Sequence, residues 1–232
     1  MSDTKEENES GISEDITRIS DEIIHGEDCS RIERIMRALE LTEGVQIARR
    51  YLAMNAFDGA LTMLGLLLGG LIMLYQEPPR TVFNSTLLGA IGTSLAMAIS
   101  GFSGSYLTES AERDREVEEM GRAMLCDMSE SMYARATKTT SVIVAIVDGA
   151  SPAVAAFIVI IPLLTVRFSV FDFFTSFYAA IVVCMILLFL LGLFLGKVSK
   201  KSIWKYGAKT FMAGIVTALL MYLISIYTGA AP

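Results

Sequence analysis

Histidine and tryptophan are almost absent from this chain, which has one residue of each type among its 232. In contrast, 53% of the residues are hydrophobic and the mean hydropathy is positive. This balance is typical of membrane proteins and excludes an ordinary soluble domain. The net charge of −6 does not argue against a membrane location, because the charged residues lie mostly outside the apolar runs.

Cysteine is also scarce, and the three that occur, Cys29, Cys126 and Cys184, are far apart with no C-x-x-C spacing. This pattern predicts reduced thiols and neither a disulfide framework nor a zinc site. The single His25 lies outside the apolar runs, so the sequence offers neither a Ser/His pair nor a metal-binding pair of histidines. We therefore expect no enzyme activity and no tightly bound cofactor.

Five apolar runs are long enough to cross a bilayer as helices at about 1.5 Å per residue. The predicted fold is an all-α membrane protein with five transmembrane helices, an N-terminal amphipathic helical region and a short acidic cytoplasmic helix between spans two and three. The spans are expected at about 51–75, 85–107, 139–166, 173–196 and 206–227. This divides the chain into an N-terminal region (1–48), spans one and two (49–108), an acidic Glu/Met-rich segment (109–138), spans three and four (139–196), and a basic turn with span five (197–232).

The N-terminal region is polar and acidic, so we expect no cleavable signal peptide. Residues 1–13 are expected to be disordered, whereas apolar residues recur at helical spacing over 12–23 and again over 32–39. Two short amphipathic helices are therefore predicted. They could lie on the cytoplasmic membrane face, pack on a cytoplasmic domain, or simply be solvated.

Positive charge is distributed unevenly between the loops. The loops after spans one and three carry one arginine each, Arg80 and Arg167, while the other seventeen Lys and Arg residues lie before span one, between spans two and three, and around the turn into span five. The positive-inside rule then predicts a cytoplasmic N-terminus and a C-terminus outside, in a multi-pass protein that we expect in the cell membrane.

Two of the spans each carry one acid. Asp58 and Asp148 both stand in the phrase Asp-Gly-Ala, and helical rise places each about 12 to 15 Å above the cytoplasmic edge. An acid at that depth costs about 2.5 kcal/mol or more, so it usually faces a protein interior or a water-filled path. The two acids are interpreted as marking a cation pathway. The alternative is an acid that is hydrogen-bonded to a neighbouring helix.

Further features could serve a cation. Pro152 cannot donate a hydrogen bond to the carbonyl of Asp148, which leaves that oxygen free in the helix. Methionine is a soft ligand that suits ferrous iron, and Met97 is the preferred candidate within the spans, although any single methionine is more often a packing residue. Small residues at close-packing spacing, including Gly65 with Gly69 in span one, predict tight helix contacts within one chain or between two.

The acidic segment after span two stacks carboxylates along one helical face. Its glutamates recur at spacings of three and four, and a stripe of methionines continues along the predicted helix: Glu109, Glu112, Glu116 and Glu119, then Met120, Met124, Met128 and Met132. A bound divalent cation would relieve the repulsion between the glutamates. Alternatively, Arg113, Arg115 and Arg122 neutralise them and the methionines pack against a partner helix.

Two motifs stand at the ends of the first two spans. Span one carries Asn55-Ala56-Phe57-Asp58-Gly59, and span two ends in Gly104-Ser105-Tyr106-Leu107-Thr108-Glu109-Ser110-Ala111-Glu112-Arg113-Asp114. These motifs resemble the vacuolar iron transporter family of divalent metal transporters, whose first span has an Asn-Asp-Gly phrase and whose second span ends in a similar frame. Two positions depart from that frame: the family's glutamate before the tyrosine is Ser105, and its methionine is Gly101, with Met97 one turn away.

The resemblance implies a dimer in the lipid bilayer that exports Fe²⁺ or Mn²⁺ from the cytosol in exchange for protons. It implies that Asp58 lies in the pathway and that the cytoplasmic glutamates collect metal. From the residues of this chain we also expect Asn55 to line the pathway, Asp148 to replace the acid lost from span two, and Met124 and Met128 to serve as metal ligands. No nucleic-acid partner is expected. The alternative function is a membrane sensor or scaffold that binds cations on its glutamate face without transporting them.

Overall fold

The structure, a computed structural model, describes residues 31–168 and 171–230. Five long helices form the molecule: α3 (Gly44–Met73), α4 (Pro79–Met124), α5 (Met132–Leu164), α6 (Phe173–Val198) and α7 (Ile203–Tyr227). The short α2 (Arg31–Leu41) precedes them, and a 3₁₀ turn, η1 (Thr165–Phe168), follows α5. No strand occurs within the described ranges, so the predicted all-α class is confirmed.

Each of the five predicted spans corresponds to one helix that is long and apolar enough to cross a membrane. This architecture is that of a multi-pass helical membrane protein. The second of the two predicted amphipathic helices is α2, and the first falls on residues outside the described ranges.

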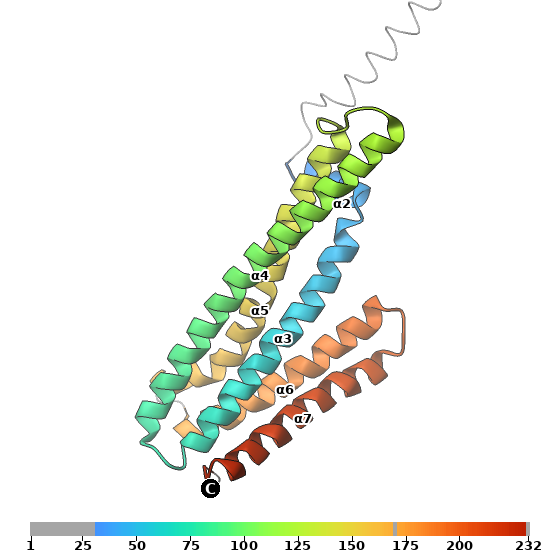
Figure 1. The fold of residues 1–232 in the computed structure, drawn as a ribbon. Coiled ribbons are helices and arrows are strands. Elements are labelled where there is room, and N and C mark those ends of the chain that lie inside the picture. Colours follow the sequence, from blue (N-terminus) through green and yellow to red (C-terminus); the bar gives the residue numbers. More distant parts are fainter. Residues whose placement is uncertain (1–30, 169–170, 231–232) are drawn as a thin grey trace, which may run out of the picture.

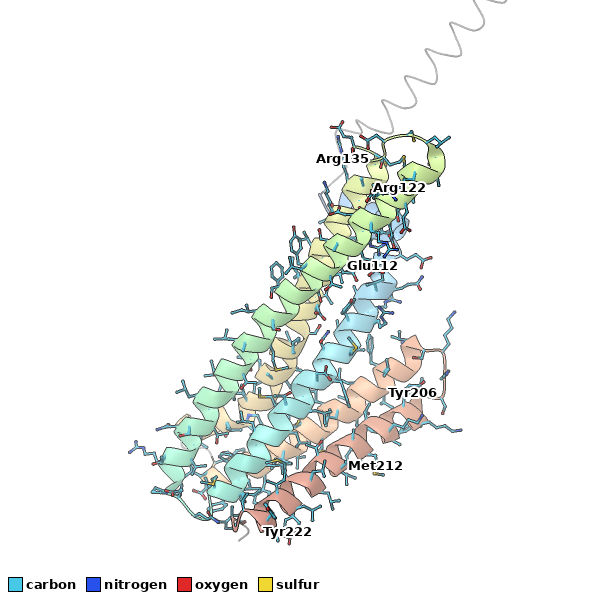
Figure 2. The ribbon with its side chains drawn as sticks, in the orientation of Figure 1. Glu112, Arg122, Arg135, Tyr206, Met212 and Tyr222 are labelled. Atoms are coloured by element: carbon cyan, nitrogen blue, oxygen red, sulfur yellow. The ribbon has the colours of Figure 1, made fainter. Side chains whose placement is uncertain are left out.

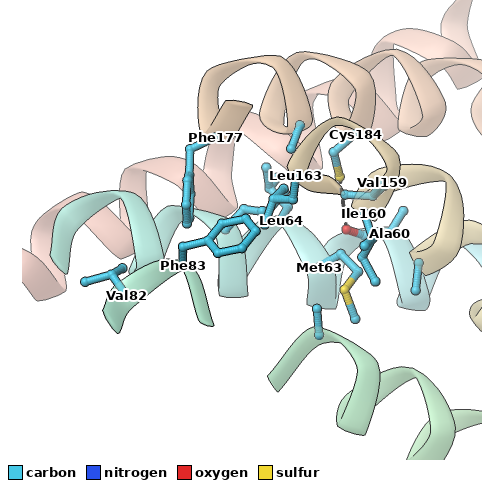
Figure 3. Packing of buried hydrophobic residues seen from close by; sticks show 14 of the residues in the cluster. Ala60, Met63, Leu64, Val82, Phe83, Val159, Ile160, Leu163, Phe177 and Cys184 are labelled. Atoms are coloured by element: carbon cyan, nitrogen blue, oxygen red, sulfur yellow. Dashed lines mark hydrogen bonds between the residues drawn. The ribbon is translucent and has the colours of Figure 1, made fainter. Parts of the chain in front are cut away.

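Helix α3 lies at the centre of the molecule, with α4 and α5 on one side and the α6–α7 hairpin on the other (Figure 1). The core is formed where α3, α5 and α6 meet (Figure 3), and Met63, Leu64, Val159 and Phe177 are almost completely buried there. The Cys184 thiol donates a hydrogen bond to the Ala60 carbonyl at 3.2 Å, which ties α6 to α3. This apolar core fixes the relative positions of α3 and α5.

Helix α4 is the longest element and continues well past the apolar part of its sequence. Its 46 residues span about 69 Å at 1.5 Å per residue, whereas a bilayer core is about 30 Å thick. The acidic segment is therefore helical, as expected, but is continuous with the second apolar run. Together with α2 and the start of α5 it forms one end of the molecule, which we call the acidic end (Figure 1).

The predicted methionine stripe is interrupted. Helix α4 ends at Met124, because Leu125 adopts a left-handed conformation with φ of 55°, and the chain reverses before α5 starts at Met132. Met120, Met124, Met128 and Met132 therefore do not share one helical face. The prediction of a continuous stripe was wrong because periodicity alone gives no sign of the reversal between residues 125 and 131.

Close packing of small residues occurs at some predicted positions and not at others. Gly192 and Gly196 of α6 lie directly against the backbone of α7, with no room for a Cβ atom. In contrast, a Cβ on Gly65 would meet no atom within 4 Å. Within one chain, the predicted motif of span one therefore makes no close contact at Gly65, whereas a Cβ on Gly69 would lie 3.6 Å from Met221 of α7.

Candidate functional site

Three helices meet at the carboxylate of Asp148. Asn55 Nδ2 donates to Asp148 Oδ1 from α3, and Ser105 Oγ donates to Asp148 Oδ2 from α4. Only 5% of Asp148 is exposed. Both oxygens of this acid therefore have a protein donor, each from a helix distant in sequence. We call these three residues the Asp148 node.

Glycines bring the three helices close enough for this contact. A Cβ on Gly149 would lie 2.5 Å from the carbonyl oxygen of Ala98, so α4 and α5 touch through their backbones. One helical turn beyond the node, a Cβ on Gly59 would lie 2.8 Å from the Cα of Pro152. The small side chain of Ser105 can reach Asp148 because the backbones approach so closely.

The free carbonyl that Pro152 leaves at Asp148 is covered by a neighbouring helix. A Cβ on Gly101 of α4 would lie 3.2 Å from this oxygen. The backbone of α4 at Gly101 thus packs closely against this carbonyl. Pro152 lies within an unbroken α5.

Asp58 does not join the Asp148 node. It is exposed on α3, while Asn55, three residues earlier, faces Asp148. Since Asn55 pairs with Asp148 and Gly59 with Pro152, the two acids lie within about one helical turn of each other along the bundle. The two acids therefore lie at a similar depth, but Asp58 is on the exposed side of α3 and Asp148 is buried between helices. The expectation that both acids line one path inside a single chain is not supported.

A polar line leads from the Asp148 node toward the acidic end. Asn55 Nδ2 also lies 3.2 Å from the carbonyl oxygen of Tyr51, one turn earlier on α3. The Tyr51 phenol lies beside Glu109 of α4. Tyr51 is thus a site residue that sequence reasoning missed, although its spacing of four from Asn55 placed it on the same helical face.

The polar line opens into a cavity of about 710 Å³ between α2, α3, α4 and α5. Five carboxylates and two guanidinium groups line it, which gives a formal charge of −3. We call it the acidic cavity, and its lining is Leu41, Thr42, Glu43, Ile47, Arg50, Glu109, Glu112, Arg113, Glu116, Glu119, Met120 and Tyr133. Figure 2 shows Glu112 on α4 at this end and Tyr222 near the opposite end.

All four predicted glutamates line the acidic cavity, but their surroundings differ. Glu109 is 5% exposed and lies 3.7 Å from Arg113, measured from Oε2 to Nε. Glu116 accepts a hydrogen bond from Arg113 at 2.8 Å, and Glu119 accepts one from the exposed Arg115. Arg122 pairs with Glu118 outside the cavity. The neutralising arginines and the glutamate face that the sequence suggested are therefore both present.

The predicted methionine ligands are not gathered at either site. Met97 is half-buried on α4, one turn from Gly101, while Met124 is exposed beyond the acidic cavity. Met128 lines a second, smaller cavity beside Gly121 and Cys126. Throughout residues 31–168 and 171–230, no three His, Cys, Asp or Glu side chains are grouped so that they could hold a metal ion.

Comparison with known proteins leaves the family open. The chain is 26% identical over 199 residues to an uncharacterized protein of Methanocaldococcus jannaschii, a match that covers 84% of this chain and 97% of the archaeal protein. No protein-family model matches the sequence, and no solved structure matches it. The archaeal protein therefore shares nearly its whole length with this chain, and the helical bundle is shown by the structure itself.

Proposed function

We propose that this protein transports a divalent cation, Fe²⁺ or Mn²⁺, across a membrane. The observation that carries the proposal is the polar line that runs from the acidic cavity past Glu109 and Tyr51 to the Asp148 node. In a helical membrane protein such polar residues are costly, and their alignment along one direction supports a path rather than isolated sites.

In the proposed mechanism the cation enters from the cytosol at the acidic cavity, where a charge of −3 raises its local concentration. It then displaces the donors of the Asp148 node and binds the carboxylate. Asn55 and Ser105 hold this carboxylate while no ion is bound. A binding site with fewer than three acidic ligands suits a transported ion, because the ion must leave the site as readily as it enters.

Protons are the proposed counter-ion. When the cation leaves Asp148, the carboxylate can take up a proton and keep the node neutral until the path returns to the cytosolic side. This coupling corresponds to proton antiport, with export of the metal from the cytosol of a cell-membrane protein. The proposed orientation has the acidic end inside and the C-terminus outside, as the distribution of Lys and Arg favours.

A homodimer is part of the proposal. Asp58, Thr62 and Gly65 follow one another at spacings of four and three on α3, and the Thr62 hydroxyl donates to the carbonyl of Asp58. Gly69, one turn further, faces Met221 of α7. A carboxylate that faces lipid is costly, so we assign the face of Asp58, Thr62 and Gly65 to contact with a second copy, where Asp58 would border a path at the dimer axis.

A second candidate is a membrane sensor that binds cations without transporting them. The specific observation in its favour is that neither Asp58 nor Asp148 lines the acidic cavity, which ends before the Asp148 node. A sensor would bind Mn²⁺ in that cavity and show no flux.

The test is metal uptake into proteoliposomes that contain the purified protein. Wild type is compared with Asp148→Asn and Asp58→Ala, and with Asp172→Asn, which alters an exposed acid at the start of α6. We expect a loss of Fe²⁺ and Mn²⁺ uptake of roughly tenfold or more at the two span positions, since each removes a charge from the path, and little change at Asp172. Binding without flux in the wild type would favour the sensor, and equal uptake by all variants would remove both acids from the mechanism.

A further inference from the structure

Arg113 is a buried cation inside a cavity proposed to collect cations. It projects from α4 into the acidic cavity and its side chain is 10% exposed, whereas Arg115 and Arg122 of the same helix have side chains that are 78% and 76% exposed. Burial of an arginine is costly unless its donors are satisfied. The contacts of Arg113 therefore indicate why an arginine is buried at this position.

Each of the three guanidinium nitrogens has a different neighbour. Nη1 donates to Glu116 Oε2 at 2.8 Å, and Nη2 lies 3.4 Å from the carbonyl oxygen of Thr42. Nε faces Glu109 at 3.7 Å and makes no hydrogen bond, although it is buried. Arg113 thus lies between two carboxylates and fully satisfies only one of them.

We propose that Arg113 is a tethered counter-cation that occupies the space between Glu109 and Glu116 until a divalent metal ion displaces it. The inference rests on the proposed function, because it names the residue that sets cation selectivity at the entrance of the path. Glu109 is the inner of the two carboxylates and lies beside Tyr51, so displacement of Arg113 opens the polar line toward the Asp148 node.

The charge of the incoming ion decides whether it can displace Arg113 from the two carboxylates. One guanidinium supplies a single positive charge to two carboxylates, and a monovalent ion offers no more than that. A divalent ion supplies both charges from one point, so its attraction to the pair is about twice as strong at equal distance. Arg113 therefore excludes Na⁺ and K⁺ from the pair while it allows Fe²⁺ or Mn²⁺ to bind.

The other arginines of the helix lack this arrangement. Arg115 and Arg122 each pair with one glutamate on an exposed surface, through Glu119 and Glu118 respectively. Exposed pairs of this kind contribute little and exchange freely with salt. Arg122→Gln is therefore a matched control: it removes the same charge from the same helix without freeing a pair of carboxylates.

The experiment measures Mn²⁺ binding to the full-length protein in detergent, from the loss of the electron paramagnetic resonance signal of free Mn²⁺. We expect Arg113→Gln to bind Mn²⁺ roughly tenfold more tightly than wild type and to become sensitive to competition by Na⁺. Arg113→Lys, which keeps the charge, should stay close to wild type, and Arg122→Gln should not differ from it. Circular dichroism establishes that each variant is folded.

A merely structural role for Arg113 predicts the opposite direction. Arg113→Gln and Arg113→Lys would then both weaken Mn²⁺ binding, and either that result or an unchanged affinity in folded Arg113→Gln would overturn the inference. The uptake assay separates this failure from failure of the proposed function. If Arg113→Gln binds Mn²⁺ more tightly and with Na⁺ competition but the wild type shows no flux, the counter-cation role is supported and transport is rejected. If flux is normal but Mn²⁺ binding by Arg113→Gln is unchanged, transport is supported and the counter-cation role is rejected.

Discussion

At the scale of single residues, Asp148 and Ser105 act as one unit. Their side chains come from α5 and α4 and meet through a hydrogen bond to Asp148 Oδ2. Ser105 stands where the resemblance to the vacuolar iron transporters places a glutamate. The carboxylate at this spot comes from α5.

Moving the carboxylate from α5 to α4 tests whether the position of the negative charge matters more than the helix that carries it. We expect Asp148→Ser to reduce Mn²⁺ uptake roughly tenfold or more, and the double change Ser105→Glu with Asp148→Ser to restore a large part of it. Ser105→Glu alone places two carboxylates together, which raises repulsion and should also lower uptake. Proteoliposome uptake by the four proteins measures the coupling. No recovery in the folded double variant would show that the helix of origin is essential.

Sequence reasoning reached several of these residues without their contacts. Asp148 was found because a lone acid in an apolar run is costly, and the glutamates of α4 because of their helical spacing. That Asn55 and Ser105 both donate to Asp148 depends on the register between three helices, which no local pattern determines. The same limit explains Asp58: its depth follows from helical rise, but the direction it faces depends on which side of α3 meets α5.

At the scale of helices, the crossing of α4 and α5 at Gly149 positions the node. A Cβ at Gly149 would lie 2.5 Å from the Ala98 carbonyl and 2.9 Å from the backbone nitrogen of Phe102. Because these are backbone atoms, they cannot move aside cheaply. Gly92 of α4 provides the contrast, since a Cβ there meets nothing within 4 Å.

Alanine substitutions at these two glycines should therefore differ in effect. We expect Gly149→Ala to destabilise the protein by about 1–3 kcal/mol through overpacking and to separate Ser105 from Asp148. Gly92→Ala should be neutral or slightly stabilising within the chain, because alanine favours the helix by about 1 kcal/mol. Thermal unfolding in detergent, followed by far-ultraviolet circular dichroism, measures the difference. Equal melting temperatures would mean that α4 and α5 are not in backbone contact at this crossing.

The helix boundaries show where sequence patterns are informative. The five apolar runs predicted the existence and order of the five long helices, since burial in lipid demands continuous apolar residues. The length of α4 was underestimated because hydropathy falls after residue 108, whereas its Glu, Arg, Ala and Met residues continue to favour helix. The stop after Met124 depends on a left-handed Leu125, a residue type that gives no signal of such a conformation.

At the scale of the whole molecule, charge and architecture suggest one orientation. The acidic end carries the turn between α4 and α5, and the α6–α7 turn with Lys197, Lys200 and Lys201 points toward the same half of the molecule (Figure 1). The α3–α4 turn and the end of α7 lie at the opposite end. This grouping is what the positive-inside rule requires if the acidic end faces the cytosol.

Native cysteines allow this orientation to be measured. Cys126 is exposed in the turn after α4, and Cys184 is buried between α6 and α3, so in a Cys29→Ser background only Cys126 should react with a membrane-impermeant maleimide. We expect no labelling in intact cells and full labelling in inverted membrane vesicles. A second protein, with Cys29→Ser, Cys126→Ser and Thr228→Cys, moves the reactive thiol to the exposed end of α7 and should show the reverse pattern. Labelling of Cys126 in intact cells would place the acidic cavity outside, and the proposed direction of export from the cytosol would then have to be abandoned.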